Sequence, residues 1–67
     1  MLSITEIRAK CPFKPFEIVR LNGKNVECVS YPFETEVGNG IGIMVRMTPG
    51  DPGTMEQTDG SLLEKIN

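Results

Sequence analysis

The residues best suited to chemistry in this 67-residue chain are two cysteines, Cys11 and Cys28, because the sequence contains no histidine. Without an imidazole, neither a Ser-His-Asp nor a Cys-His arrangement can be assembled. A cysteine nucleophile needs nearby cations or a helix N-terminus to lower its pKa. Cys11 follows Arg8 and Lys10, but it stands at the C-terminal end of a short predicted helix, where the dipole disfavours a thiolate. The sequence therefore predicts no enzyme and no catalytic residues, and a thiol-dependent enzyme or redox switch centred on Cys11 is the least favoured hypothesis.

The same two thiols are too few for a zinc site, which takes four Cys or His ligands. Asp51 lacks the neighbouring oxygen ligands of a calcium site. The glycine-rich run 38–42 precedes a strand, so it lacks the helix dipole that makes such loops bind anions. We expect no metal and no cofactor. A Cys11–Cys28 disulfide is conceivable, but cytosolic thiols stay reduced, and we interpret both residues as half-buried small apolar side chains.

Two glutamates, Glu34 and Glu36, have the i, i+2 spacing that places side chains on one face of a strand. Such a pair could serve in acid–base chemistry. Charged side chains on the solvent face of a hairpin are more typical of a feature that prevents aggregation. We adopt that interpretation.

The net charge of −2 is unevenly distributed along the chain. Residues 1–30 carry five basic and three acidic side chains, and residues 31–67 carry two basic and six acidic ones. An acidic chain is a poor non-specific phosphate binder. The basic first half, with Phe13 or Tyr31 stacking on bases, keeps a small nucleic-acid-binding β-barrel open as the alternative function.

Residues 2–10 are predicted to form a short helix. Ser3 is a good N-cap and Glu6 completes a capping box, while Leu2 and Ile7 have the spacing of a hydrophobic staple. Pro12 disfavours helical dihedrals in the residue before it and so ends the helix. Two turns do not persist alone in water, so the helix must pack on a sheet.

The stretch 12–31 predicts a β-hairpin, because Asn22-Gly23 between two β-rich runs favours a tight turn. We expect strands at 16–21 and 25–31, each with apolar residues on both faces, a pattern that suits a small barrel. Phe13 and Phe16 are expected to fill the core between helix and sheet. Lys14 between them leaves an exposed aromatic patch as the alternative.

The second half predicts further strands at 33–37, 41–48 and 54–58, with a turn at 38–40 and an irregular loop at 49–53. The run 41–48 alternates strictly and should be the central strand, with Ile41, Ile43, Val45 and Met47 facing the core. Its second face, with Gly42 and Met44, is only half polar, so a partner could cover it. Residues 61–66 fit a helical turn and a strand equally well.

These elements predict one domain over residues 1–67. The expected fold is mostly β: a small antiparallel meander or SH3-like barrel of four or five strands with a short N-terminal helix. No apolar run reaches membrane-spanning length and the opening residues are too polar for a secretory signal. We therefore expect a cytoplasmic protein without a membrane partner.

The segment Pro12-Phe13-Lys14-Pro15-Phe16, followed by a strand, Asn22-Gly23-Lys24 and Val26, resembles the opening of short uncharacterised bacterial proteins. In those proteins a Pro-Phe-x-Pro-Phe segment leads into a strand and a glycine turn. The resemblance covers about a quarter of the chain. It implies a small bacterial β domain and carries no activity or site.

The small core and the absence of a catalytic set favour a non-enzymatic protein–protein interaction module, whose partner is another protein or a second copy of the chain. Nucleic acid is the less favoured partner. The predicted interaction surface consists of Phe13, Lys14, Arg20, Lys24, Tyr31, Met44 and Arg46.

Overall fold

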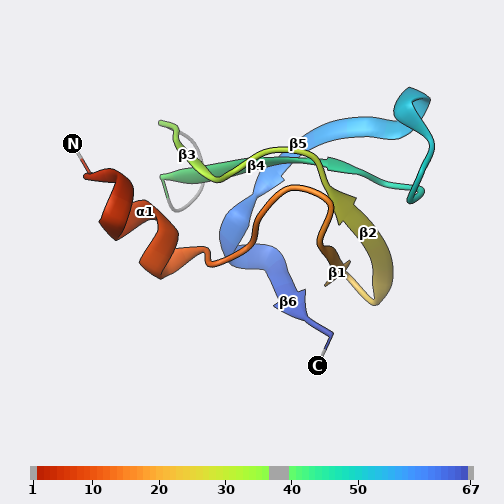
Figure 1. Cartoon of the computed structure of the whole chain (residues 1–67), viewed down its shortest axis with the longest axis horizontal. Coiled ribbons are helices and arrows are strands. Elements are labelled where there is room, and N and C mark those ends of the chain that lie inside the picture. Colours follow the sequence, from red (N-terminus) through yellow and green to blue (C-terminus); the bar gives the residue numbers. More distant parts are fainter. Residues whose placement is uncertain (1, 37–39, 67) are drawn as a thin grey trace.

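The computed structural model describes residues 2–36 and 40–66 and shows a mostly β protein with one short α-helix beside a curled antiparallel sheet (Figure 1). Helix α1 (Ile4–Lys10) begins with the predicted capping box. The Ser3 hydroxyl accepts from the Glu6 N–H at 3.1 Å, and the Glu6 carboxylate accepts from the Ser3 N–H at 3.2 Å. Ile7 is the one buried residue of α1, which explains how so short a helix stays attached to the sheet.

The strands follow the predicted order, and the first four are shorter than expected, whereas the fifth has its predicted length and is shifted by one residue. They are β1 (Ile18–Leu21), β2 (Lys24–Cys28), β3 (Phe33–Glu34), β4 (Ile41–Arg46), β5 (Met55–Asp59) and β6 (Leu63–Lys65), and two 3-10 turns, η1 (Pro52–Thr54) and η2 (Gly60–Leu62), interrupt the second half. Residues 61–66 thus contain both alternatives, the end of a 3-10 turn and a short strand. Val37 and most of the predicted 38–40 turn lie outside the described residues.

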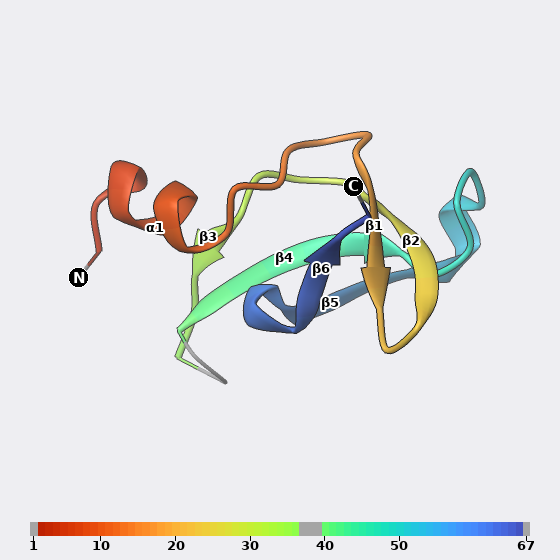
Figure 2. The same cartoon turned by 90° about the horizontal axis from the view of Figure 1, so that it is seen from below.

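The sheet is organised around β4, which pairs with three strands. β2 and β3 lie along one edge of β4, and β5 lies along the other. Arg46 of β4 pairs with both β2 and β5, and Gly42 of β4 pairs with both β3 and β5, so β5 must occupy the opposite edge. β1 continues the sheet beyond β2, and β6 pairs with β1. The sheet curls so that the β1–β2 hairpin crosses β4 (Figure 2). The result is a half-barrel in which η2 carries the chain from β5 to β6.

The core lies inside this curl. Its central residues come from alternate positions of β1, β2 and β4, as the period-2 pattern requires. The buried apolar residues are Ile7, Cys11, Phe13, Val19, Leu21, Val26, Cys28, Ile41, Ile43, Val45 and Leu63. The prediction that β4 is the main core strand is confirmed, and Met47 packs against the core from just beyond its end.

One core prediction is wrong. Phe16 was expected inside, but its side chain is 74% exposed, whereas Phe13 is buried. The chain enters β1 through a turn that points Phe16 outward, so only one of the two phenylalanines reaches the space between helix and sheet.

Candidate interaction surfaces

A tight turn at residues 14–17, called the Phe16 turn below, precedes β1. The Glu17 N–H donates to the Lys14 carbonyl at 3.2 Å, which closes a four-residue turn. Pro15 occupies the second position, where its fixed φ suits a type II turn. Phe16 occupies the third position with a φ of 71°. A type II turn requires positive φ there, so the residue favoured by the geometry is glycine.

The Phe16 turn also forms a β-bulge against β2. The Phe16 N–H donates to the Cys28 carbonyl at 2.8 Å, and the Cys28 N–H donates to the Glu17 carbonyl at 2.9 Å. Two residues of one strand therefore oppose one residue of the other. This is the bulge whose first residue is left-handed and normally glycine. The geometry of the turn and that of the bulge thus both favour glycine at position 16, which is a phenylalanine.

A phenylalanine in this position gives the fold little in return. Its ring is largely exposed, so it contributes little hydrophobic stabilisation. The turn is held instead by backbone hydrogen bonds and by the Glu17 carboxylate, which accepts from the Lys14 N–H at 3.3 Å. Lys14 is also exposed. The Phe16 turn therefore presents an aromatic ring and a neighbouring cation on a fixed backbone.

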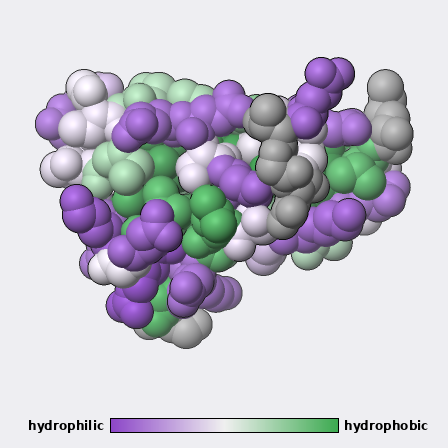
Figure 3. All heavy atoms as spheres, turned by 180° about the vertical axis from the view of Figure 1, so that it is seen from behind, coloured by the Kyte–Doolittle hydropathy of each residue, from purple (hydrophilic) through white to green (hydrophobic). Residues whose placement is uncertain are grey.

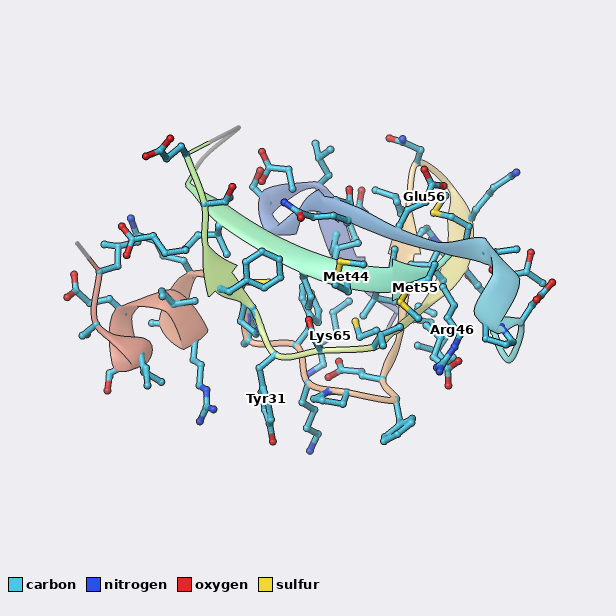
Figure 4. All side chains as sticks on the ribbon, turned by 90° about the horizontal axis from the view of Figure 1, so that it is seen from above. Tyr31, Met44, Arg46, Met55, Glu56 and Lys65 are labelled. Atoms are coloured by element: carbon cyan, nitrogen blue, oxygen red, sulfur yellow. The ribbon has the colours of Figure 1, made fainter. Side chains whose placement is uncertain are left out.

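A second surface lies on the outer face of β4 and β5, where Met44, Arg46 and Met55 point to the same side (Figure 4). The register places Met55 opposite Arg46 and Gln57 opposite Met44. Met55 is 42% exposed, and Met44 and Arg46 are half-buried. We call these four residues the methionine face: Met44, Arg46, Met55 and Gln57.

An ion pair fixes the middle of the methionine face. Arg46 Nη1 lies 3.1 Å from Glu27 Oε1, joining β4 to β2. The same carboxylate oxygen accepts from the Gly50 N–H at 3.0 Å, which fastens the loop after β4. Both side chains are about four-fifths buried, at 21% and 17% exposed. Arg46 thus joins β4 to β2 through Glu27, and Glu27 holds the loop.

The rest of the second face of β4 is partly covered by the chain itself. A Cβ on Gly42 would lie 2.9 Å from the Phe33 ring and 3.2 Å from the Gln57 amide nitrogen. Phe33 and Gln57 therefore close over this glycine. Of the half-apolar face predicted from Gly42 and Met44, only the part around Met44 is therefore open to a partner.

Tyr31 stands apart from the methionine face and points away from the sheet (Figure 4). Arg8 Cζ lies 4.4 Å from the centroid of its ring. This is a cation–π contact, which ties α1 to the segment after β2. One face of the Tyr31 ring is therefore already occupied by the chain's own cation.

The predicted surface residues are dispersed over the molecule. Met44 and Arg46 lie together, and Lys14 stands in the Phe16 turn. Arg20 lies on β1 between Asn25 and Glu64 of the flanking strands, and Lys24 stands at the start of β2. Phe13 is buried and has no place on an exposed surface, which corrects the prediction.

Two exposed residues of these surfaces are absent from the predicted interaction set, Phe16 and Met55. Pro15 was the available signal for the first, since proline at the second position of a type II turn requires positive φ at the next residue. The segment containing Met55 gave no comparable signal. Seen from behind, apolar atoms lie exposed in the middle of the molecule among hydrophilic ones (Figure 3). Exposed apolar residues are common on soluble proteins and by themselves identify no site.

Both thiols are buried and free. Burial raises the pKa of Cys28 to about 11, and the nearby Glu17 carboxylate acts in the same direction. Burial also raises the pKa of Cys11, whose sulfur lies 3.8 Å from the Gly60 carbonyl oxygen. A raised pKa keeps both thiols protonated at neutral pH, the opposite of what a nucleophile requires.

Asp51 also has a local role. Its carboxylate accepts from the Gly53 N–H at 2.9 Å and caps η1. Within residues 2–36 and 40–66, no cluster of three or more acidic, Cys or His side chains is arranged to hold a metal ion. No helix in the same part of the chain has the length and apolar character needed to cross a lipid bilayer.

Comparison of the chain with protein-family models, with curated proteins and with solved structures gave no match.

Proposed function

We propose that this protein is a non-enzymatic interaction module that binds another protein, with the Phe16 turn as its anchor. The observation that carries the proposal is an exposed phenylalanine held in a left-handed conformation that favours glycine. The half-barrel, which we assign to the SH3-like class, then acts as a rigid support for this ring. Its cytoplasmic location and bacterial origin belong to the same proposal.

The energetics support a contact role for Phe16. A left-handed conformation costs a residue with a side chain roughly 1–2 kcal/mol. An exposed ring recovers little of that by burial within the chain. Aromatic side chains supply large contact areas at low entropic cost and dominate many protein interfaces. An exposed ring that costs the free protein stability and offers a large contact area to a partner is what an interaction anchor requires.

The neighbouring charge indicates the kind of partner. Lys14 begins the same turn and is exposed. A pocket that accepts the ring would therefore gain from an acidic group at its rim, since complementary charge speeds association and excludes wrong partners. The proposed partner is a protein with an apolar pocket bordered by carboxylates.

The nucleic-acid alternative is less well supported. Phe13 is buried, and Arg8 already covers one face of the Tyr31 ring. Of the two stacking residues that this alternative relied on, one is thus inaccessible and the other offers a single ring face. Phe16 and Lys14 remain available to a base, so nucleic acid is tested alongside protein.

The experiment compares the wild type with Phe16→Gly in pull-downs from native lysate. Phe16→Gly removes the ring and relieves the backbone, so lost binding cannot be ascribed to unfolding. Ile4→Ala is the matched control, because Ile4 is also exposed, at 69%, but lies on α1. We expect Phe16→Gly to lose the captured protein and Ile4→Ala to keep it.

Equal capture by the wild type and Phe16→Gly would refute the proposal. A fluorescent single-stranded oligothymidylate supplies the second arm. Salt-sensitive binding of this probe at about 50 mM salt, lost in Phe16→Gly, would replace the protein partner by nucleic acid.

A further inference from the structure

The longest free edge of the sheet is β5, and we infer that it pairs with β5 of a second copy of this chain, antiparallel and centred on Gln57. This extends the proposed function to a second partner and a second surface. It rests on the proposed function only in that both describe a protein–protein interaction. Either surface can therefore fail in experiment without the other.

The direction of the backbone groups of β5 follows from the hydrogen bonds around β4. The Met47 N–H donates to the Thr54 carbonyl at 3.0 Å, which makes this pair a hydrogen-bonded one. Hydrogen-bonded pairs alternate with non-hydrogen-bonded pairs in an antiparallel ladder. Continuing the register, Glu56 and Thr58 face β4, while Met55 and Gln57 direct their N–H and C=O groups to the free edge.

The opposite edge of β4 supports this assignment. The Met44 carbonyl accepts from the Val29 N–H at 2.7 Å, on the side of β2. Met44 is the partner of Gln57 in the register. Since Met44 directs its backbone away from β5, its partner Gln57 directs its own backbone away from β4.

A symmetric pair centred on Gln57 uses this edge well. The two Gln57 residues exchange both backbone hydrogen bonds across the two-fold axis. Met55 then stands opposite Asp59 of the second copy, and Glu56 stands opposite Thr58 of the second copy. Each acidic side chain thus faces a neutral one.

Neighbouring registers are less favourable. A pair centred on Glu56 places two carboxylates directly opposite each other, which is destabilising. A pair centred on Thr58 takes Gly60 into the ladder, although Gly60 already begins η2. The charge of Glu56 and the start of η2 at Gly60 together select the register centred on Gln57.

Side chains leave the edge open at its centre. The Gln57 amide folds back towards Gly42, where its nitrogen would lie 3.2 Å from a Cβ. Met55, Glu56 and Gln57 are all exposed. β5 contains no proline and no lysine, the residues that commonly protect an edge strand.

Length and geometry distinguish β5 from the other edges. β6 has three residues and β3 has two, whereas β5 has five, each paired in register with β4. Short edges are one way in which proteins avoid unwanted strand pairing. β5 is the edge without that protection. In the dimer, the methionine faces of both copies would join along one continuous sheet.

Disulfide trapping tests the register. With Gln57→Cys, the two new thiols face each other across the axis with Cα atoms about 5.5 Å apart, within reach of a disulfide. With Glu56→Cys, the two Cα atoms are about 8 Å apart, too far for a disulfide. We expect Gln57→Cys to form covalent dimers under mild oxidation at least about tenfold faster than Glu56→Cys.

Proline substitution tests the edge itself. Gln57→Pro removes an N–H that faces outward, so it should keep the fold and weaken dimerisation by about tenfold or more. Thr58→Pro removes an N–H that faces β4 and should instead destabilise the fold. Sedimentation equilibrium measures the first effect, and thermal unfolding followed by circular dichroism measures the second.

Three outcomes would overturn the inference: preferential trapping by Glu56→Cys, unchanged association in Gln57→Pro, or a wild type that stays monomeric and a Gln57→Cys variant that fails to crosslink. Phe16→Gly should leave dimerisation unchanged. If the dimer is absent while Phe16→Gly still loses its protein partner, only the inference fails. If the dimer is present while Phe16→Gly binds as the wild type does, only the anchor role of Phe16 fails.

Discussion

Two tight turns flank β1, and both need residues with positive φ, but they use opposite kinds of residue there. The turn after β1 consists of Asn22 and Gly23, with φ values of 52° and 81°. These are the residue types that a two-residue hairpin with two left-handed positions favours. The turn before β1 needs a left-handed residue as well and places Phe16 there.

The difference separates residues chosen for folding from residues retained for another reason. Asn22 and Gly23 fit their backbone and present no distinctive side chain. Phe16 strains its backbone and presents a large exposed ring. Unusual backbone conformations in bulky residues gather at functional positions. This contrast is the reason why we propose binding at the Phe16 turn and only a structural role for the Asn22–Gly23 turn.

Alkaline pH should have the largest effect on stability, and it acts beside the Phe16 turn, because Cys28 exchanges backbone hydrogen bonds with that turn. Its pKa rises from the ordinary 9.0 to about 11 in the folded protein. The folded value lies above the unfolded one, so the contribution of the thiol to stability is complete below pH 9.0 and is lost as the pH rises towards 11. Chemical denaturation across this range should show a falling free energy of unfolding.

The matched control for this pH effect is Cys28→Ala. It lowers stability at every pH by leaving a cavity, but its free energy of unfolding should fall less steeply above pH 9.0. Identical slopes in wild type and variant would show that another group dominates, such as Cys11, whose pKa burial also raises.

Substitution at Gly23 should have the next largest effect. A β-branched residue is poorly tolerated at its φ of 81°, so Gly23→Val should destabilise the fold by about 2 kcal/mol. Gly23→Ala should cost less, about 1 kcal/mol. Space is not the cause, since a Cβ at Gly23 would meet no atom within 4 Å. Urea denaturation measures both values.

Phe16→Gly should act in the opposite direction and stabilise the fold by about 1 kcal/mol. Relief of the left-handed strain outweighs the extra flexibility of glycine in the unfolded chain and the small loss of burial. Phe16→Ala is the control, because it removes the ring and keeps the strain. A Phe16→Gly variant no more stable than Phe16→Ala would mean that the ring itself supports the turn.

The smallest effect is expected for Glu17→Gln. The carboxylate accepts from the Lys14 N–H at 3.3 Å in an exposed position, and exposed hydrogen bonds of this kind contribute about 0.5 kcal/mol or less. The amide oxygen of glutamine can replace the acceptor. A loss above 1 kcal/mol (roughly one net hydrogen bond) in urea denaturation would give Glu17 a larger part in holding the turn.

The elements whose sequence signals are local were predictable. The capping box at Ser3 and the Asn22–Gly23 turn depend on residues three or fewer positions apart, and both occur as predicted. The alternation along β4 likewise identifies its buried face. In each case propensity and tertiary structure agree.

The candidate surfaces were less predictable, because they depend on where elements meet. An apolar residue such as Phe16 is assigned to the core by pattern, although the turn directly before β1 points it outward. The backbone N–H and C=O of Gln57 point to the free edge because of which residue pairs of β4 and β5 are hydrogen-bonded. Composition does not encode that pairing. Residues 61–66 appeared ambiguous because they contain two different short elements in succession.

Gly60 has a consequence for the order in which the chain can fold. A Cβ at this glycine would lie 2.9 Å from the Cys11 sulfur and 3.2 Å from Ile41. Cys11, in the connector after α1, is thus packed against a residue 49 positions later. β1 likewise pairs with β6, which lies near the other end of the sequence. Contacts this distant in sequence slow folding. During synthesis the N-terminal half therefore cannot complete its packing until η2 and β6 have emerged.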